Sequence, residues 1–182
     1  PFLGVPAILD EFVPFDYEVI IVMVNDGERI VSFPIGQNIH RDGILDLCIV
    51  PAPRMDDAVR ARLVEQSEAF MRRCGYTGIL AIEYFVKGGE LYFNEMAPRP
   101  HNSGHYTIEG CTTNQFRELC RYLLGEPLQE PRLVAPTVMK NILGEDLAAA
   151  EAVAAETGAE GAQSPEEGVY VHLYGKSVSK PK

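Results

Sequence analysis

The chain has 182 residues, 46% of them apolar and 23% charged, which is typical of a globular protein with one domain or with one domain and a small appendage. Its formal net charge of −10 argues against nucleic acid or an anionic membrane surface as a partner, because phosphate groups attract a basic protein face. The sequence contains no run of about 18 apolar residues, which is the length that would predict a membrane span. The four cysteines show neither C-x-x-C nor zinc-ligand spacing, so a reducing compartment, the cytoplasm, is expected.

The first part of the chain is predicted to consist mainly of strands. A short apolar strand is expected at residues 7–9 and a long β-branched strand over 17–24. The sequence Asn25-Asp26-Gly27-Glu28 favours a hairpin turn, from which a strand returns over 29–33. Residues 34–55, with two glycines and three prolines, are predicted to be irregular.

A helix and a second hairpin are predicted next. The helix spans residues 56–73, begins with an aspartate cap, keeps its apolar residues at helical spacing and ends at Gly75. A buried strand over 76–86 and a returning strand over 90–96 flank the turn Lys87-Gly88-Gly89.

Another helix is predicted over residues 114–124. Thr112 and Gln115 are interpreted as its capping box, because a hydroxyl three residues before a glutamine can satisfy free N–H groups. Apolar residues at helical spacing form one face, and Gly125 ends the helix.

After this helix the chain changes character. A strand is predicted over 135–144, an alanine-rich helix over 146–156 and a strand over 168–175. We therefore expect two domains, residues 1–128 and 129–182. The predicted fold class is α+β, with an antiparallel sheet that carries helices, followed by a small, β-rich and incomplete domain. Both ends of the sequence read as if cut from a longer chain.

Two glutamates of the second hairpin are candidate metal ligands. Glu83 lies in an otherwise apolar strand, and a lone buried carboxylate is costly, so it either has a partner or faces solvent from a one-sided sheet. The hairpin register decides whether Glu95 can be that partner. A turn symmetric about the two glycines pairs Glu83 with Asn94 and directs Glu95 to the other face. A three-residue loop would instead place both glutamates diagonally on one face, about 7–8 Å apart.

Asn94 adds an amide oxygen beside these carboxylates. Such oxygens are typical ligands of hard cations, and Mg²⁺ completes its coordination with water and phosphate oxygens. The pattern therefore favours nucleotide-dependent chemistry over a structural calcium site, since no EF-hand spacing is present.

A polar loop follows the hairpin directly. Arg99 lies between two prolines, which restrict the backbone, and its guanidinium can hold a phosphate or carboxylate or form a structural ion pair. The loop His101–His105 reads HNSGH, and its glycine permits an unusual turn. Because two histidines stand beside the candidate metal ligands, a functional role is favoured over a structural one.

Further candidates precede the first helix. His40 is explained equally well by a backbone hydrogen bond and by a role in a site. Glu18 could accept hydrogen bonds from ribose hydroxyls, and Asp10 and Glu11 lie near the same strand junction. Spacing alone does not decide the roles of these residues.

Several segments resemble one enzyme family. The strings AIEYFV, ELYFNEMAPRPHNSGH, PFDYEVI, NIHRDGILDL and VHLYGK are similar to the N5-carboxyaminoimidazole ribonucleotide synthetases, which are ATP-grasp enzymes of purine biosynthesis. The resemblance covers nearly the whole chain, and NE-x-A-P-R-x-HNSGH is its most specific part. The same block occurs in the long phosphoribosylaminoimidazole carboxylases of fungal type.

The resemblance implies ATP and Mg²⁺ as cofactors and gives each candidate a role. The implied metal ligands are Glu83 and Glu95; the implied nucleotide-binding residues are Asp10, Glu11, Phe12, Val13, Glu18, His40, Asn94 and Glu95; the implied catalytic residues are Arg99, His101 and Asn102; and the implied substrate-binding residues are His101, Asn102, Ser103 and Lys176.

The implied reaction carboxylates 5-aminoimidazole ribonucleotide with ATP and bicarbonate, through carboxyphosphate. The expected partners are therefore aminoimidazole ribonucleotide and bicarbonate, and a homodimer is implied for the intact enzyme. The family's amino-terminal domain, phosphate-binding lysines and Gly-rich loop have no counterpart in this sequence, so the chain alone is expected to be inactive. Two alternatives stay open: another ATP-grasp carboxylate-amine ligase, and a nucleotide-binding module without turnover.

Overall fold

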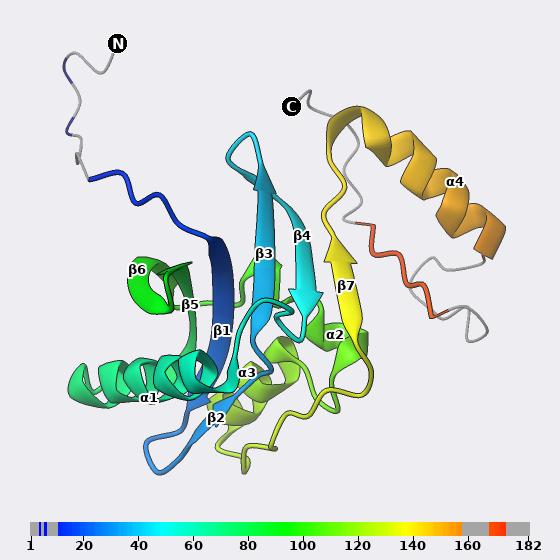
Figure 1. The fold of residues 1–182 in the computed structure, drawn as a ribbon. Helices are drawn as coiled ribbons and strands as arrows, with labels where there is room; N and C mark the ends of the chain where they lie inside the picture. Colours follow the sequence, from blue (N-terminus) through cyan, green and yellow to red (C-terminus); the bar gives the residue numbers. More distant parts are fainter. Residues whose placement is uncertain (1–3, 5, 7–10, 158–167, 174–182) are drawn as a thin grey trace.

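A computed structural model describes residues 4, 6, 11–157 and 168–173 and shows an antiparallel sheet with helices on both faces, as the α+β prediction requires (Figure 1). The strand order is β6-β5-β1-β3-β4-β7, and β2 pairs with β1. No described helix combines the length and the apolar character that a bilayer span requires. The strands are β1 (Tyr17–Asn25), β2 (Ile30–Ser32), β3 (Gly36–Arg41), β4 (Ile44–Val50), β5 (Gly78–Lys87), β6 (Glu90–Ala97) and β7 (Thr137–Lys140). The helices are α1 (Asp57–Arg73), α2 (Thr107–Gly110), α3 (Gln115–Leu124) and α4 (Leu147–Thr157), with 3-10 turns η1 (Asn102–Gly104) and η2 (Gly144–Asp146).

β1 and β5 form the centre of the sheet because both are long apolar runs. They pair antiparallel from Tyr17 opposite Val86 to Asn25 opposite Gly78. Since side chains alternate between the two faces of a strand, each of these strands contributes to a core on both sides. The strands predicted over 17–24, 76–86 and 90–96 are confirmed, and β2 confirms the first hairpin.

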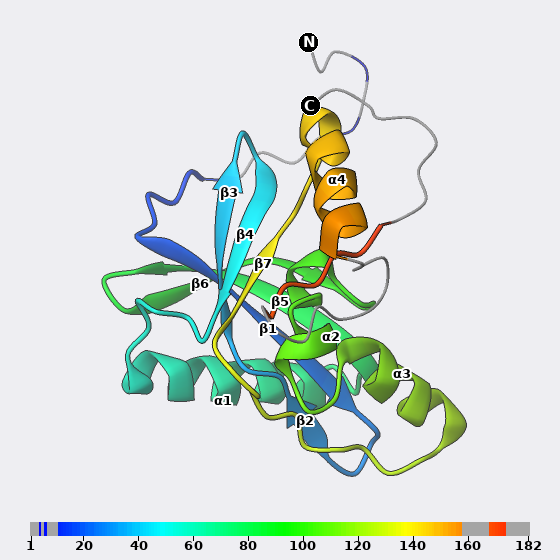
Figure 2. The ribbon, with the colours of Figure 1, turned by 90° about the vertical axis from the view of Figure 1, so that its right-hand side faces the viewer.

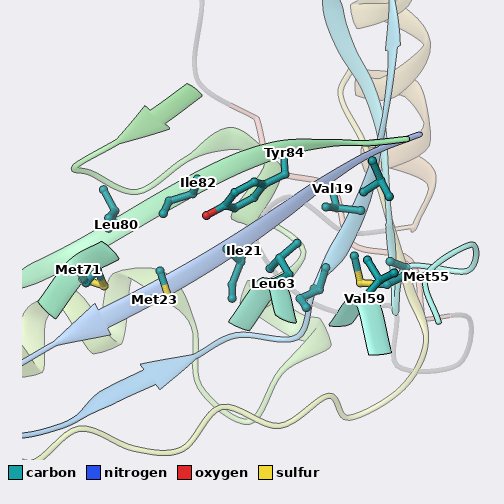
Figure 3. Packing of buried hydrophobic residues seen from close by; sticks show 13 residues of the cluster. Val19, Ile21, Met23, Met55, Val59, Leu63, Met71, Leu80, Ile82 and Tyr84 are labelled. Carbon is teal, nitrogen blue, oxygen red and sulfur yellow. The ribbon is translucent and has the colours of Figure 1, made fainter. Parts of the chain in front are cut away.

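Helix α1 covers one face of this strand pair. Asp56 Oδ1 accepts the N–H of Val59 at 2.8 Å and starts the helix, as predicted. Val59, Leu63 and Met71 form the buried stripe of the helix and pack on alternate side chains of β1 and β5 (Figure 3). Burial of this stripe holds α1 against the sheet.

Helices α2 and α3 cover the opposite face, and Figure 2 shows α1 and α3 on either side of β1. Leu119 and Tyr122 of α3 pack on a second cluster that includes Ile20 and Val22. This face is the one that carries the candidate site described below.

The start of α3 differs from the prediction. Asn114 Oδ1 accepts the N–H groups of Phe116 and Arg117, so the cap is Asn114 and the predicted capping box of Thr112 with Gln115 is wrong. Asparagine is a good N-cap, and Asn114 takes the capping position that was predicted for the Thr112 hydroxyl. Gly125 ends the helix in the left-handed region with φ of 68°, as predicted.

The prediction of irregular structure over residues 34–55 is wrong. Strands β3 and β4 pair antiparallel around Asp42 and Gly43, whose φ angles are 53° and 74°. An Asp-Gly sequence favours such a turn because both central residues need positive φ. The signal is weak because the last three residues of β3 are exposed, so no alternation of buried and exposed residues marks the strand.

β7 extends the sheet beyond the predicted domain boundary. It pairs with β4 from Thr137 opposite Val50 to Lys140 opposite Leu47, and α4 lies beside it in Figures 1 and 2. The predicted strand over 135–144 and helix over 146–156 are confirmed. Of the strand predicted over 168–175, residues 168–173 are described and show only isolated bridges; the strand predicted at 7–9 lies outside the described residues.

Candidate functional site

Three buried polar side chains interrupt the apolar α3 face of the sheet near the start of β1. Glu18 lies opposite Asn38 of β3, and Glu83 lies opposite Ile20 of β1. Alternation along the strands directs these three side chains to the same face. Glu18 and Glu83 are each 5% exposed and Asn38 is 4% exposed. Glu83 is therefore buried, and the alternative that it faces solvent is wrong.

The hairpin of β5 and β6 starts with the predicted turn symmetric about the two glycines, but the pairing of Glu83 with Asn94 that this turn predicted is wrong. Lys87 pairs with Glu90 across a two-residue turn, and both turn glycines have positive φ, so the three-residue loop is wrong. A β-bulge then inserts Asn94 between the pairs Tyr84–Phe93 and Glu83–Glu95. The extra residue returns Glu95 to the face of Glu83, directly opposite it. The two carboxylates thus share a face, as the metal prediction required, because of the bulge and not because of the turn.

Two donors hold one carboxylate oxygen of Glu83. Asn38 Nδ2 donates to Glu83 Oε1 at 2.8 Å, and Ser103 Oγ donates to the same oxygen at 2.9 Å. Burial, and next the charge of Glu18, raise the pKa of Glu83 to about 7. A bound cation would offset both of these effects, so the environment of Glu83 favours a positively charged ligand.

Glu18 connects β1 to β3 and β6. Its Oε2 lies 3.0 Å from His40 Nδ1, and its Oε1 accepts from Asn94 Nδ2 at 3.4 Å. The hydrogen bond with Glu18 raises the pKa of His40. The structure therefore brings together three residues that the resemblance assigned to the nucleotide, and it gives His40 a carboxylate partner.

The polar loop after β6 brings His101 to the two glutamates. His101 Nδ1 lies 3.7 Å from Glu83 Oε1, and His101 Nε2 lies 3.5 Å from Glu95 Oε1. Burial lowers the pKa of His101, although the charge of Glu95 opposes this effect. Ser103, fully buried in η1, fixes the loop to Glu83. An imidazole with a lowered pKa thus stands between two carboxylates.

Arg99 and Asn102 lie in the same loop but make local contacts. Arg99 is exposed, and its Nη1 donates to the carbonyl of Pro100 at 3.0 Å. Its positive charge contributes to the lowered pKa of His101, so it acts on the site electrostatically. The carbonyl of Asn102 accepts the N–H of His105 at 3.0 Å.

The nucleotide-binding residues that the resemblance implies before β1 lie on the surface where they are described. Glu11 is exposed, Phe12 is 82% exposed, and the carbonyl of Val13 accepts the N–H of Phe15 at 2.9 Å. Asp10 and Lys176 lie outside the described residues.

An aromatic pair that was not predicted from the sequence lies beside Glu18. The rings of Phe15 and Phe85 stack with centroids 4.3 Å apart and planes 7° from parallel. Phe85 of β5 lies directly opposite Glu18 of β1, and Phe15 stays partly exposed. The pair offers an apolar surface next to the polar cluster.

Asn38 was also missed, although the sequence held a signal for it. Recognition of the Asp42-Gly43 turn would have placed β3 as a strand, and Asn38 would then lie two residues from His40 on the same face. Its Nδ2 also lies 3.0 Å from Ser103 Oγ, so it ties β3 to both Glu83 and the loop.

The donor set fits a divalent cation. One atom each of Glu83, Glu95 and His101 lie within 4.8 Å of one another. Both donors to Glu83 use Oε1, so neither of them occupies its Oε2. Carboxylate oxygens are the ligands that Mg²⁺ prefers.

Two protein-family models match the chain. A model described as ATP-grasp domain matches residues 3–116, and a model described as phosphoribosylaminoimidazole carboxylase C-terminal domain matches residues 137–182. The first match covers every element of the candidate site.

Similar proteins agree with these matches. The chain is 39% identical over 175 residues to the N5-carboxyaminoimidazole ribonucleotide synthase of Vibrio cholerae, an alignment that covers 93% of this chain and 42% of that protein. The chain thus spans less than half the length of this relative.

Solved structures give the same result. An ADP complex of N5-carboxyaminoimidazole ribonucleotide synthetase superposes with a TM-score of 0.83 at 36% identity, covering 94% of this chain and 43% of that one. The Aspergillus clavatus enzyme, in complex with ADP and 5-aminoimidazole ribonucleotide, superposes with a TM-score of 0.77 at 28% identity, covering 93% and 45%. These similarities confirm the resemblance that the sequence motifs predict.

Proposed function

The chain belongs to the ATP-grasp family, and from this premise we propose that it takes part in the carboxylation of 5-aminoimidazole ribonucleotide to N5-carboxyaminoimidazole ribonucleotide, with ATP and bicarbonate. The observation that carries the proposal is the convergence of Glu83, Glu95 and His101 in one site. The similarity to enzymes of this name supports the choice of substrate over other carboxylate-amine ligations.

In this proposal the polar face of the sheet binds the nucleotide. Glu83 and Glu95 would hold Mg²⁺, which would supply positive charge against the phosphate oxygens of the nucleotide. Glu18 accepts from the ribose hydroxyls, and the Phe15–Phe85 stack beside it gives the base an apolar wall. His40 and Asn94 keep the Glu18 carboxylate in place through their hydrogen bonds.

The loop after β6 is the proposed site of bicarbonate chemistry. The Arg99 guanidinium supplies positive charge where the phosphoryl oxygens of carboxyphosphate develop negative charge. His101 and Asn102 orient the carboxyl donor, and His101 accepts a proton from the substrate amine. Ser103 keeps this loop against Glu83. The loop therefore lies next to the proposed metal ligands.

The proposal extends to organisation and location. The match to the ATP-grasp model ends at residue 116, and the match to the second family model starts at residue 137. This supports a division near residue 128. The free thiols of Cys48, Cys74, Cys111 and Cys120 are consistent with the cytoplasm. The resemblance alone supports a homodimer, and the coverage of 42% of the relative supports the view that this chain needs further residues for turnover.

A chimera tests the proposal directly. Residues 11–182 replace the corresponding part of the Vibrio cholerae relative, and phosphate release is measured with ATP, Mg²⁺ and bicarbonate. We expect release to rise when aminoimidazole ribonucleotide is added, and Glu95→Gln in the same chimera should abolish that rise. A chimera that melts cooperatively and binds ADP, but shows no stimulation, would contradict the proposed substrate. If the chimera does not melt cooperatively, ADP binding by the chain itself with and without Mg²⁺ tests the nucleotide site.

A further inference from the structure

The side chain of Gln115 is fully buried, and both ends of its amide bind the backbone of His101. Gln115 Oε1 accepts the N–H of His101 at 3.0 Å, and Gln115 Nε2 donates to the carbonyl of His101 at 2.9 Å. One side chain at the start of α3 therefore satisfies both backbone groups of a residue fourteen positions earlier. A buried amide that meets both of its partners in this way fixes the position of the segment it binds.

The packing around Gln115 leaves the loop little room to move. A Cβ atom on Gly104 would lie 2.6 Å from Gln115 Oε1, so any larger residue at position 104 would displace the amide from its present place. Thr107 also links the loop to α3. Its Oγ1 donates to the carbonyl of Gly104 at 2.7 Å and accepts the N–H of Gln115 at 3.2 Å. The loop is thus held by side-chain and backbone contacts on two sides.

The second histidine of the loop meets the same carbonyl. His105 Nδ1 lies 2.9 Å from the carbonyl oxygen of His101 and 3.2 Å from Gln115 Nε2. A carbonyl oxygen has two lone pairs, so it can accept from the Gln115 amide and from a protonated His105 Nδ1 together. This arrangement selects the tautomer of neutral His105 with its proton on Nδ1 and its lone pair on Nε2.

We propose that Gln115 is the positioning residue of the HNSGH loop: its amide holds the backbone of His101, and the shared carbonyl fixes His105 as the Nδ1–H tautomer. Through the backbone of His101, Gln115 directs the imidazole to its place 3.5 Å from Glu95. Through the same short turn it keeps Ser103 on Glu83. The relevance of this positioning to carboxylation rests on the proposed function, but the positioning itself does not.

The test compares three variants of the chain with the wild type. Gln115→Met keeps the size of the side chain and removes both hydrogen bonds, whereas Gln115→Glu keeps an acceptor for the His101 N–H and loses the donor. Glu118→Gln is the matched control, because Glu118 is a fully buried polar residue of the same helix that binds Thr113 and the N–H of Gln129 instead of the loop.

Three measurements are made on each protein, and the first is hydrogen exchange of the His101 amide. Two-bond ¹H–¹⁵N spectra of the histidine rings report the tautomer of His105 and the environment of His101. Titration with Mn²⁺, followed by the broadening of the His101 ring signals, reports the affinity of the carboxylate site.

The wild type should show His105 protonated at Nδ1, and Gln115→Met should shift the ring signals of both loop histidines and weaken Mn²⁺ binding about tenfold. Gln115→Glu should retain protection of the His101 amide from hydrogen exchange, which Gln115→Met should lose. Glu118→Gln should leave the ring signals and Mn²⁺ affinity unchanged, even if it lowers stability as much.

A wild-type His105 ring protonated at Nε2 would overturn the proposal, and so would His101 signals that do not change in Gln115→Met. The tautomer of the wild type needs no variant, so it decides even if a variant does not fold. If no protein binds Mn²⁺, the proposed metal role of Glu83 and Glu95 fails, while the ring spectra still decide the role of Gln115.

Discussion

At the scale of the residue, Glu83 shows how a carboxylate can occupy an apolar strand. Asn38 and Ser103 donate to one oxygen, and Glu18 lies close enough to raise the pKa of Glu83 by its charge. The hydrogen bonds lower the cost of burial but do not remove it, because burial is still the largest effect on the pKa. This residual cost is what a cation would relieve.

Glu83 should make stability depend on pH. Its pKa of about 7 in the folded chain lies above the ordinary value of 4.5, so the folded state binds the proton more tightly than the unfolded state. The contribution of Glu83 to the free energy of unfolding therefore increases as pH falls from about 7 to about 4.5, by at most about 3 kcal/mol. Urea unfolding of wild type and Glu83→Gln at pH 5 and pH 8 should give a difference in pH dependence of this sign. A variant whose stability varies with pH as in the wild type would contradict the assignment.

Glu95 should matter for the cation and little for folding. Its side chain is 59% exposed, so Glu95→Gln should change the free energy of unfolding by no more than about 0.5 kcal/mol. The loss of one carboxylate charge should lower Mn²⁺ affinity about tenfold or more. Calorimetric titration checks the affinity, and Glu90→Gln at the far end of the same strand is the control. Equal affinities of Glu95→Gln and wild type would exclude Glu95 as a ligand.

At the scale of the element, the bulge in β6 decides what the hairpin can do. Phe93 keeps its place against Tyr84, with an edge-on ring contact at 6.1 Å, while Glu95 reaches the opposite face. In a regular strand, residues two positions apart point to the same face. Phe93 and Glu95 could then not lie on opposite faces of the sheet. The bulge lets one strand serve the α1 core and the site at once.

Deletion experiments can locate this bulge. Removal of Asn94 should leave Phe93 opposite Tyr84 and Glu95 opposite Glu83, so the variant should fold and still bind Mn²⁺. Removal of Tyr92 deletes the same number of residues but moves Phe93 to the other face, and we expect a loss of more than about 1 kcal/mol. Urea unfolding of both variants gives the comparison. If the Asn94 deletion were the less stable of the two, the extra residue would lie elsewhere in the strand.

At the scale of the whole molecule, the sheet joins the two predicted domains. β7 follows the predicted boundary in sequence, yet it pairs with β4. Lys140 of β7 contacts the buried carboxylate of Asp46, and Asn141 Nδ2 donates to the carbonyl of Leu45 at 2.9 Å. Residues 137–141 are thereby fixed to the edge of the sheet opposite β6.

The contact of Lys140 with Asp46 should stabilise this edge. Lys140→Met keeps the aliphatic part of the side chain and removes the charge. It should destabilise the docking of β7 by about 1–2 kcal/mol. The loss should be smaller than for a fully buried ion pair, because Lys140 is partly exposed. Hydrogen exchange of the β7 amides should accelerate accordingly. Arg41→Met, which removes a more exposed cation beside the same carboxylate, should have a smaller effect. The same exchange rates in Lys140→Met and wild type would contradict this role.

Most of the helices and strands follow from local signals in the sequence. The apolar runs of β1 and β5, the Asp56 cap, the positive-φ glycines and the stripe of α1 are local signals, because each depends on residues within a few positions of one another. The motif NE-x-A-P-R-x-HNSGH likewise identified the family from one continuous segment.

The assembly of the site depends on contacts between residues that are distant in the sequence. Whether Glu95 joins Glu83 depends on a bulge, and a bulge is a property of two paired strands that the sequence of one strand does not show. Asn38 and Gln115 reach the site from β3 and α3, 45 residues before Glu83 and 14 residues after His101 in the chain. Turns and helices follow from neighbours in sequence, whereas the polar contacts of a site follow from neighbours in space.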